Sequence, residues 1–104
     1  MAEPTEKDYK RYLNTRFHIN FDNDQKVELE LVEVRPYQAT ETERPGYERF
    51  SLYFAGPRNI RLPQYTYPLQ HAEIGERYMF LVPVGVEERG ELYEAVFNFK
   101  ISNE

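Results

Sequence analysis

Two apolar segments separated by a short polar connection occupy residues 78–99, and this stretch constrains the fold more than any other. The pattern predicts one long β-hairpin with Gly90 in the left-handed position of its turn. Successive side chains of a strand point to opposite faces, so each arm carries apolar groups on both faces. The predicted core face holds Tyr78, Phe80, Val82, Val84, Tyr93, Ala95, Phe97 and Phe99, and the second face holds Met79, Leu81, Leu92 and Val96.

A hairpin that is apolar on both faces needs a cover on each of them. The sequence leaves two covers open for the second face. One is a short N-terminal helix that carries Tyr9, Tyr12 and Leu13 on one side, and the other is a second subunit. Met79 and Leu81 lie on this second face and are therefore candidate contacts with a partner.

Four further segments alternate apolar and polar residues with the period of a half-buried strand. In the segment 26–35 the apolar positions change phase between Leu31 and Val32, which predicts a β-bulge. Pro63 and Pro68 cannot donate to a β-ladder, so the last of the four segments is predicted to lie at a sheet edge. The four predicted strands cover residues 15–21, 26–35, 49–55 and 64–70.

These elements predict one all-β domain, a small six-stranded antiparallel sandwich or partly open barrel with a short N-terminal helix. Thr5 suits the N-cap position of that helix, with Glu6 and Asp8 in its first turn. Residues 36–47 show no apolar period and predict an exposed loop. Within the single domain 1–104, the expected divisions are a frayed end at residues 1–6, the helix at residues 7–13 and the β core at residues 15–101.

The composition argues against several classes of partner. The formal net charge is −5 and basic residues form no dense cluster, so nucleic-acid binding is not expected. No apolar run approaches the ~20 residues that span a bilayer, and the charged N-terminus does not resemble a signal peptide. The chain has no cysteine, which fits a reducing compartment. We therefore expect a cytoplasmic protein without nucleic-acid or membrane partners.

Residue types that carry catalysis are few and scattered. His18 and His71 have no further ligands at the spacing of a metal site. Ser51 lies in an ordinary strand rather than a nucleophile elbow, and Ser102 lies in the tail. No glycine-rich phosphate loop occurs. The sequence therefore predicts a non-enzymatic protein with no catalytic residue, no metal and no cofactor.

Tyrosines are the remaining candidates for binding. Tyr37 and Tyr47 lie in the long loop and Tyr53 points outward from its strand, so all three are candidate contacts with a protein or a ligand. The preferred interpretation is an interaction or structural module that binds a protein partner, associates with itself or packs in a larger assembly. The alternative is a β-barrel that binds a small ligand or a carbohydrate, with tyrosines lining its mouth.

Four motifs follow one another along the chain: F-S-L-Y-F-A-G-P from Phe50, L-P-Q-Y-T-Y-P-L-Q-H-A-E-I-G from Leu62, F-L-V-P-V-G from Phe80 and Y-E-A-V-F-N from Tyr93. As a set they resemble a family of small, uncharacterised bacterial all-β domains with no assigned activity, and the resemblance implies no functional residues. The association of this family with phage-tail-like and tail-collar genes implies a structural or accessory role. Tyr65 stands where the family usually has glycine, which puts a tight turn at that position in doubt.

Overall fold

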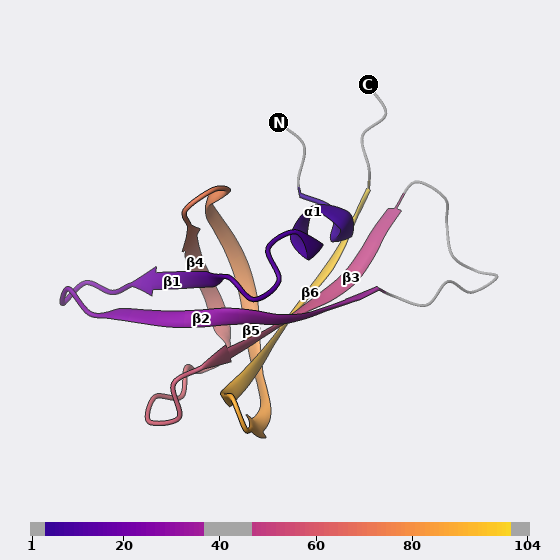
Figure 1. Cartoon of the computed structure of the whole chain (residues 1–104). Helices are drawn as coiled ribbons and strands as arrows, with labels where there is room; N and C mark the ends of the chain where they lie inside the picture. Colours follow the sequence, from indigo (N-terminus) through magenta and orange to yellow (C-terminus); the bar gives the residue numbers. More distant parts are fainter. Residues whose placement is uncertain (1–3, 37–46, 101–104) are drawn as a thin grey trace.

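Six antiparallel strands and one short helix form the computed structural model, which describes residues 4–36 and 47–100, and in the second range the side chains of residues 48–99 (Figure 1). The strands close into one barrel in the order β1–β2–β3–β6–β5–β4. The predicted all-β fold is confirmed, and it is a closed barrel. No helix in the described part of the chain is long and apolar enough to span a membrane. The elements are α1 (Glu6–Lys10), β1 (Arg16–Asn20), β2 (Lys26–Pro36), β3 (Tyr47–Gly56), β4 (Tyr65–His71), β5 (Gly75–Glu87) and β6 (Gly90–Lys100).

The ladders that close the barrel differ in length. β3 pairs with β6 through ten residue pairs, whereas β1 and β4 meet at the single pair His18 and Gln70. β4 therefore has a neighbour on each side, and the prediction that it is a free edge is wrong. The join between β4 and β1 is nevertheless the shortest of the six, which fits a strand that contains Pro68 and follows Pro63.

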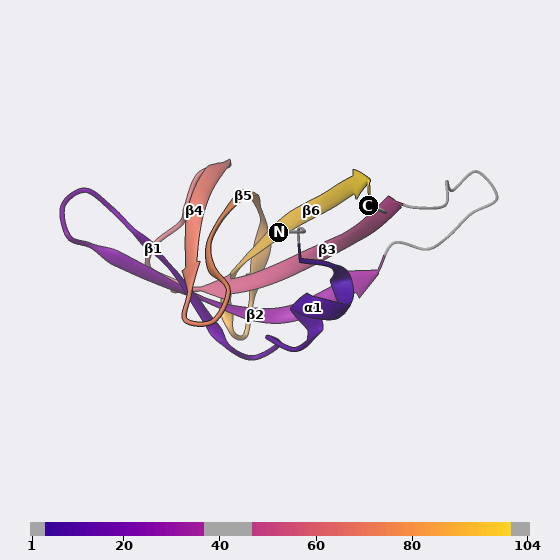
Figure 2. The ribbon, with the colours of Figure 1, turned by 90° about the horizontal axis from the view of Figure 1, so that it is seen from above.

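β5 and β6 diverge where Val82 pairs with Glu94. Residues 75–81 of β5 pair with β4 instead, and β6 continues beside β3 as far as Lys100. Figure 2 shows β2, β3 and β6 running together away from β4 and β5. We call this three-stranded extension the wing, which consists of residues 33–36 of β2, 47–53 of β3 and 94–100 of β6.

The predicted β-bulge in β2 is confirmed. The pairing of β2 with β3 shifts between Leu31 and Glu33. Val27, Leu29 and Leu31 are buried before the shift, and Val34 is buried after it. The extra residue therefore returns the apolar side chains to the core face, where the change of phase in the sequence would otherwise have turned them outward.

The two faces of the first hairpin arm are the reverse of the prediction. Met79 is 2% exposed and Leu81 is fully buried, whereas Tyr78 is 68% and Phe80 is 49% exposed. The register with β4 decides this orientation, because Met79 pairs with Tyr67, whose side chain is also buried. Both residue sets of the arm are apolar, so its period fits either orientation and only the neighbouring strand selects one.

Side chains from all six strands fill the barrel interior. The rings of Phe17 and Phe54 meet edge to face, with their centroids 5.2 Å apart. Tyr93 and Ala95 of the second hairpin arm face inward, as predicted, while Val96 faces outward. The other fully buried apolar side chains of the strands are Ile19, Leu29, Leu31, Phe50, Leu52, Leu69, Met79 and Leu81.

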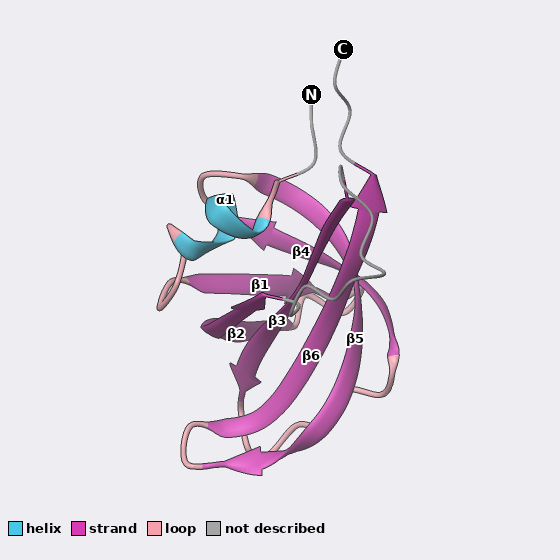
Figure 3. Cartoon of the chain, turned by 90° about the vertical axis from the view of Figure 1, so that its right-hand side faces the viewer, coloured by secondary structure: helices cyan, strands magenta, loops and turns pink. Residues whose placement is uncertain are grey.

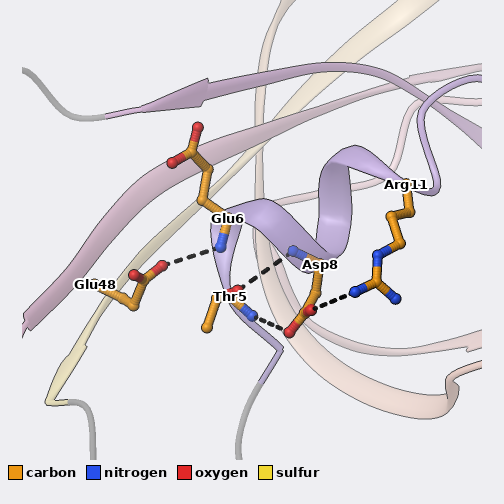
Figure 4. Close-up of polar contacts among 5 residues, drawn as sticks. All are labelled: Thr5, Glu6, Asp8, Arg11 and Glu48. Carbon is orange, nitrogen blue, oxygen red and sulfur yellow. Dashed lines mark hydrogen bonds and ion pairs between the residues drawn. The ribbon is translucent and has the colours of Figure 1, made fainter.

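The N-terminal helix begins as the sequence predicts. The Thr5 hydroxyl accepts a hydrogen bond from the Asp8 backbone N–H at 3.3 Å, and the Asp8 carboxylate accepts one from the Thr5 backbone N–H at 2.9 Å (Figure 4). This reciprocal pair is a capping box. The Glu6 backbone N–H also donates to the Glu48 carboxylate at 3.0 Å, which ties the start of α1 to β3. The helix spans Glu6–Lys10, which is shorter than the predicted 7–13.

α1 packs against the inner side of the wing, near the end of the molecule where β6 ends (Figure 3). The Tyr9 ring lies 5.8 Å from that of Phe50 and 5.7 Å from that of Phe97, centroid to centroid. The helix therefore covers core residues of β3 and β6. On the second face of the hairpin Val96 is exposed, so the helix, one of the two covers that the sequence left open, does not cover this residue. Tyr78 and Phe80, which were predicted to lie in the core, are exposed as well.

Tyrosine hydroxyls anchor the connection between β3 and β4. The Tyr93 hydroxyl accepts a hydrogen bond from the Leu62 backbone N–H at 2.8 Å, and the Tyr67 hydroxyl donates to the Pro63 carbonyl at 2.7 Å. Burial raises the pKa of both tyrosines, so both hydroxyls stay protonated at neutral pH. Tyr65 begins β4 with an exposed side chain, so its ring needs no space in the core.

Candidate interaction surface

Exposed hydrophobic side chains gather on the β5–β6 hairpin. Seven large hydrophobic residues are exposed among the described side chains, and five of them belong to this hairpin. Single hydrophobic residues are ordinary on a protein surface, but a group on one structural element is typical of an interaction site. We call these five residues the hairpin surface: Tyr78, Phe80, Val84, Val86 and Val96.

The β6 part of the hairpin surface continues onto the outer side of the wing. Val96 pairs with Ser51 of β3, and the next outward position, Glu94, pairs with Tyr53. On its other side Glu94 pairs with Val82 of β5. Side chains of directly paired residues lie within contact distance on one face of a sheet. The outer surface is therefore continuous from β5 across β6 to β3.

A polar network crosses the outer side of the wing. Arg35 Nε donates to Glu33 Oε2 at 2.9 Å, and Arg35 Nη1 donates to the Tyr53 hydroxyl at 3.3 Å. The Tyr53 hydroxyl donates to Glu94 Oε2 at 2.8 Å. The Arg35 guanidinium also lies 4.7 Å from the centre of the Tyr53 ring, within the range of a cation–π contact. These contacts hold the Tyr53 side chain in one orientation on the surface.

The network also raises the pKa of two of its members. Burial and the hydrogen bond to Glu94 raise the pKa of Tyr53, so its hydroxyl keeps its proton and remains a donor. The hydrogen bond to Glu33 and the charge of that residue raise the pKa of Arg35. Two carboxylates and one guanidinium give the network a formal charge of about −1 at neutral pH. This part of the surface therefore favours a partner that brings hydrogen-bond donors or a positive charge.

An open hollow of about 450 Å³ lies on the wing beside this network. Aliphatic, aromatic and charged residues line it together, as in the mixed surfaces at which proteins meet. Val96 belongs both to this lining and to the hairpin surface, so the hollow borders that surface. The lining includes Arg35, Arg49, Tyr53, Glu94, Val96 and Asn98.

A second hollow, of about 280 Å³, lies over β1, β2 and β3 and has a different character. Arg16, Glu28, Glu30 and Arg89 contribute its charged walls. Arg16 Nη1 lies 3.2 Å from Glu28 Oε1, and both side chains are exposed. Exposed ion pairs of this kind are well solvated and contribute little energy. This hollow therefore offers less for recognition than the hairpin surface does.

His71 is buried at the join between β4 and β1. Its Nδ1 accepts a hydrogen bond from the Glu73 backbone N–H at 3.1 Å, and its Nε2 lies 3.0 Å from Thr15 Oγ1. The Thr15 hydroxyl donates to the Tyr12 carbonyl at 2.6 Å, so it accepts from His71 Nε2–H. Burial lowers the pKa of His71, in keeping with this neutral ring. The residue therefore ties the end of β4 to the segment between α1 and β1.

The residues that the sequence indicated as candidate contacts lie in different parts of the structure. Tyr53 lies at the centre of the wing network. Met79 and Leu81 lie in the core, so their predicted place on a partner-facing side of the hairpin is wrong. Tyr37 lies outside the described residues, and the backbone of Tyr47 begins β3.

Sequence reasoning missed the outward role of Tyr78 and Phe80, because it assigned them to the core. It also missed Glu91, a buried acidic residue with Arg61 Nε 3.8 Å from its carboxylate. The alternation within β5 did show that either Tyr78 and Phe80 or Met79 and Leu81 must face away from the core. It did not show which of these two pairs faces outward. Among the described residues, no group of three or more His, Cys, Asp or Glu side chains could hold a metal ion.

Comparison with protein-family models matches residues 4–97 to a domain of unknown function, DUF6916. Searches of curated proteins and of solved structures found no match. The family match agrees with the resemblance of the four sequence motifs to a family without an assigned activity.

Proposed function

The chain belongs to the DUF6916 family, a domain of unknown function, and we propose that it is a non-enzymatic interaction module that binds a protein partner through the hairpin surface. Packing as a subunit of a larger assembly, such as a phage-tail-like structure, is one form of this role. The observation that carries the proposal is the concentration of five of the seven exposed large hydrophobic residues on the β5–β6 hairpin.

The hairpin surface has the chemistry of a protein-binding site. Tyr78 and Phe80 supply aromatic area, and Val96 extends the apolar part toward the wing. Aromatic residues are enriched in protein interfaces, and their burial supplies much of the binding energy. Tyr53 and Arg35 provide oriented polar groups at the border of this area, where interfaces are ordinarily polar.

The alternative function, binding of a small ligand or a carbohydrate within the barrel, has less support. Phe17, Phe54 and Tyr93 occupy the interior together with the aliphatic core. The connection between β3 and β4 is tied to the barrel through Leu62 and Tyr93. The 450 Å³ hollow lies on the outer side of the wing and is open, whereas small-ligand sites bury most of the ligand surface.

The proposal places the module in a bacterial cytoplasm, with no nucleic-acid or membrane partner and no catalytic role. The absence of cysteine from the sequence supports a reducing compartment. The formal net charge of −5 supports a partner other than nucleic acid.

Capture of the partner from native cells with face-directed variants tests the proposed function. The tagged chain is compared with Phe80→Lys, which puts a charge into the hairpin surface at a half-exposed position. Ile60→Lys is the matched control, since Ile60 is exposed but lies outside the hairpin. A partner that binds the wild type and the control is expected to lose at least about tenfold in affinity to Phe80→Lys, the effect of one interface hot spot.

Equal binding of one partner to all three proteins would remove the hairpin surface from the proposal. Recovery of no specific partner, with no assembly of the chain itself, would overturn the proposed function as a whole. Circular dichroism of each variant confirms that it is folded before its binding is compared.

A further inference from the structure

The second half of β6 is a free sheet edge. On one side, β6 pairs with β3 as far as Lys100. On the other side, its pairing with β5 stops at Glu94, and no described strand pairs with residues 95–100 there. Every second residue of an antiparallel strand directs its N–H and C=O to the same side. About half of this segment therefore presents unpaired backbone donors and acceptors on the open side.

Within its own residues, this edge lacks the devices that normally prevent strands from pairing with other molecules. Such devices are prolines, charged side chains and bulges. The segment 95–99 reads A-V-F-N-F, with no charged residue, no proline and no glycine, and its pairing with β3 is regular. Val96 is exposed, and Phe97 is stacked on Phe50 at a centroid distance of 4.9 Å. The edge is thus held rigid by the wing and is open to another strand.

The segment is complementary to itself in an antiparallel register. A two-fold axis at Phe97 sets Phe97 opposite Phe97 of a second copy and Val96 opposite Asn98, so that paired side chains lie on the same faces. No two like charges meet within residues 95–99. In the sequence the flanking residues have opposite charges, Glu94 before the segment and Lys100 after it, and this register places them opposite each other.

We propose that two copies of the chain pair antiparallel through the free edge of β6, which joins their wings into one six-stranded sheet. The occupant of the edge is a second copy because the segment offers neutral, self-complementary pairing at every position from Ala95 to Phe99. This inference rests on the proposed role as an interaction module and names one of its partners. The β5 part of the hairpin surface, with Tyr78 and Phe80, remains available to other proteins.

Molecular mass in solution tests the pairing. The wild type is expected to shift with concentration from 12.5 kDa to twice that mass in sedimentation or light-scattering experiments. The double variant Val96→Lys with Asn98→Lys places lysine opposite lysine twice in the proposed register, so it stays at the single-chain mass. The double variant Val96→Glu with Asn98→Glu stays single for the same reason. An equimolar mixture of the two variants regains the doubled mass, because each lysine then faces a glutamate.

Cysteine pairs test the register without adding charge. The chain contains no cysteine, so introduced thiols have no competing partners. Val96→Cys mixed with Asn98→Cys is expected to give a disulfide-linked dimer under mild oxidation, because opposed positions of neighbouring strands come within disulfide reach. Each variant alone is expected to give several-fold less, because its thiol then faces Asn98 or Val96 of the copy. Tyr78→Cys, exposed on β5, is the control and stays unlinked.

Two results together overturn the inference. The wild type keeps the single-chain mass at every concentration, and the mixture of the two cysteine variants gives no linked dimer. A dimer that survives in the folded lysine double variant overturns it as well. These results are separable from a failure of the proposed function. A partner lost on Phe80→Lys but kept by the lysine double variant supports the hairpin surface whether or not the β6 edges pair.

Discussion

Two neighbouring residues of β5, Phe80 and Leu81, give a direct test of the orientation of this strand. Truncation of Leu81 to alanine removes a fully buried side chain of β5 from the core. Removal of a buried leucine leaves a cavity and costs about 2–5 kcal/mol. Phe80 is nearly half exposed, so Phe80→Ala loses only part of its burial and is expected to cost about 1 kcal/mol.

The expected difference is large enough for a simple measurement. For a domain of this size, each kcal/mol of lost stability lowers the melting temperature by about 4–8 °C. Leu81→Ala at about 3 kcal/mol is therefore expected to melt about 12–24 °C below the wild type, and Phe80→Ala about 4–8 °C below it. Thermal and urea unfolding followed by circular dichroism measure both. Urea midpoints are compared at equal slope, because a changed slope indicates a changed unfolded state.

The reverse order would refute the orientation. If Phe80→Ala were the more destabilising change, Phe80 would lie in the core and Leu81 would face outward, as the sequence alone predicted. The hairpin surface and the proposed function would then lose their basis. Equal and small effects would mean that neither residue contributes to a packed interior, which contradicts the buried position of Leu81.

Three further predictions concern His71, Tyr93 and Thr5. Burial lowers the pKa of His71 below its ordinary 6.5, so the neutral ring contributes its full stability above pH 6.5. This stability is progressively lost as the pH falls from 6.5 to the lower pKa of the folded state. The urea midpoint should therefore fall in this pH window, and it should fall less in His71→Gln. Tyr93→Phe leaves the buried Leu62 N–H without its acceptor and should cost about 1–3 kcal/mol in urea unfolding. Thr5→Ala removes the cap of α1 and should cost about 1 kcal/mol, with Thr5→Ser near wild type.

Each of these three expectations has a contrary result. If the urea midpoint of the wild type falls no more steeply with decreasing pH than that of His71→Gln, the buried ring does not cause the pH dependence. Tyr93→Phe with wild-type stability would mean that the Leu62 N–H finds another acceptor. Equal stability of Thr5→Ala and Thr5→Ser would show that the helix N-terminus frays despite its capping box.

The surface of β5 and β6 shows how one pattern serves both folding and recognition. Met79 and Leu81 build the core from one face of β5, while Tyr78 and Phe80 leave the other face apolar and exposed. A strand that is apolar on both faces is ordinarily covered by one layer on each face. The described chain supplies one layer, and the proposed partner supplies the other.

The sequence determined the features of this protein that depend on short-range chemistry. The Thr5 cap, the glycine turn at Gly90 and the β-bulge after Leu31 all follow from residues within a few positions of one another. The all-β fold follows from alternation within single strands. The outward position of Tyr53 follows from the same alternation.

Tertiary structure alone decided the inward face of β5 and the free edge of β6. Both apolar faces of β5 satisfy the same local period, so its orientation came from the register with Tyr67 and the rest of β4. The free edge of β6 exists because β5 turns to β4 upstream of Val82, while β6 stays with β3. These outcomes depend on pairing between distant segments, since a strand carries the same backbone groups along both of its edges and cannot specify by itself which neighbour will take them.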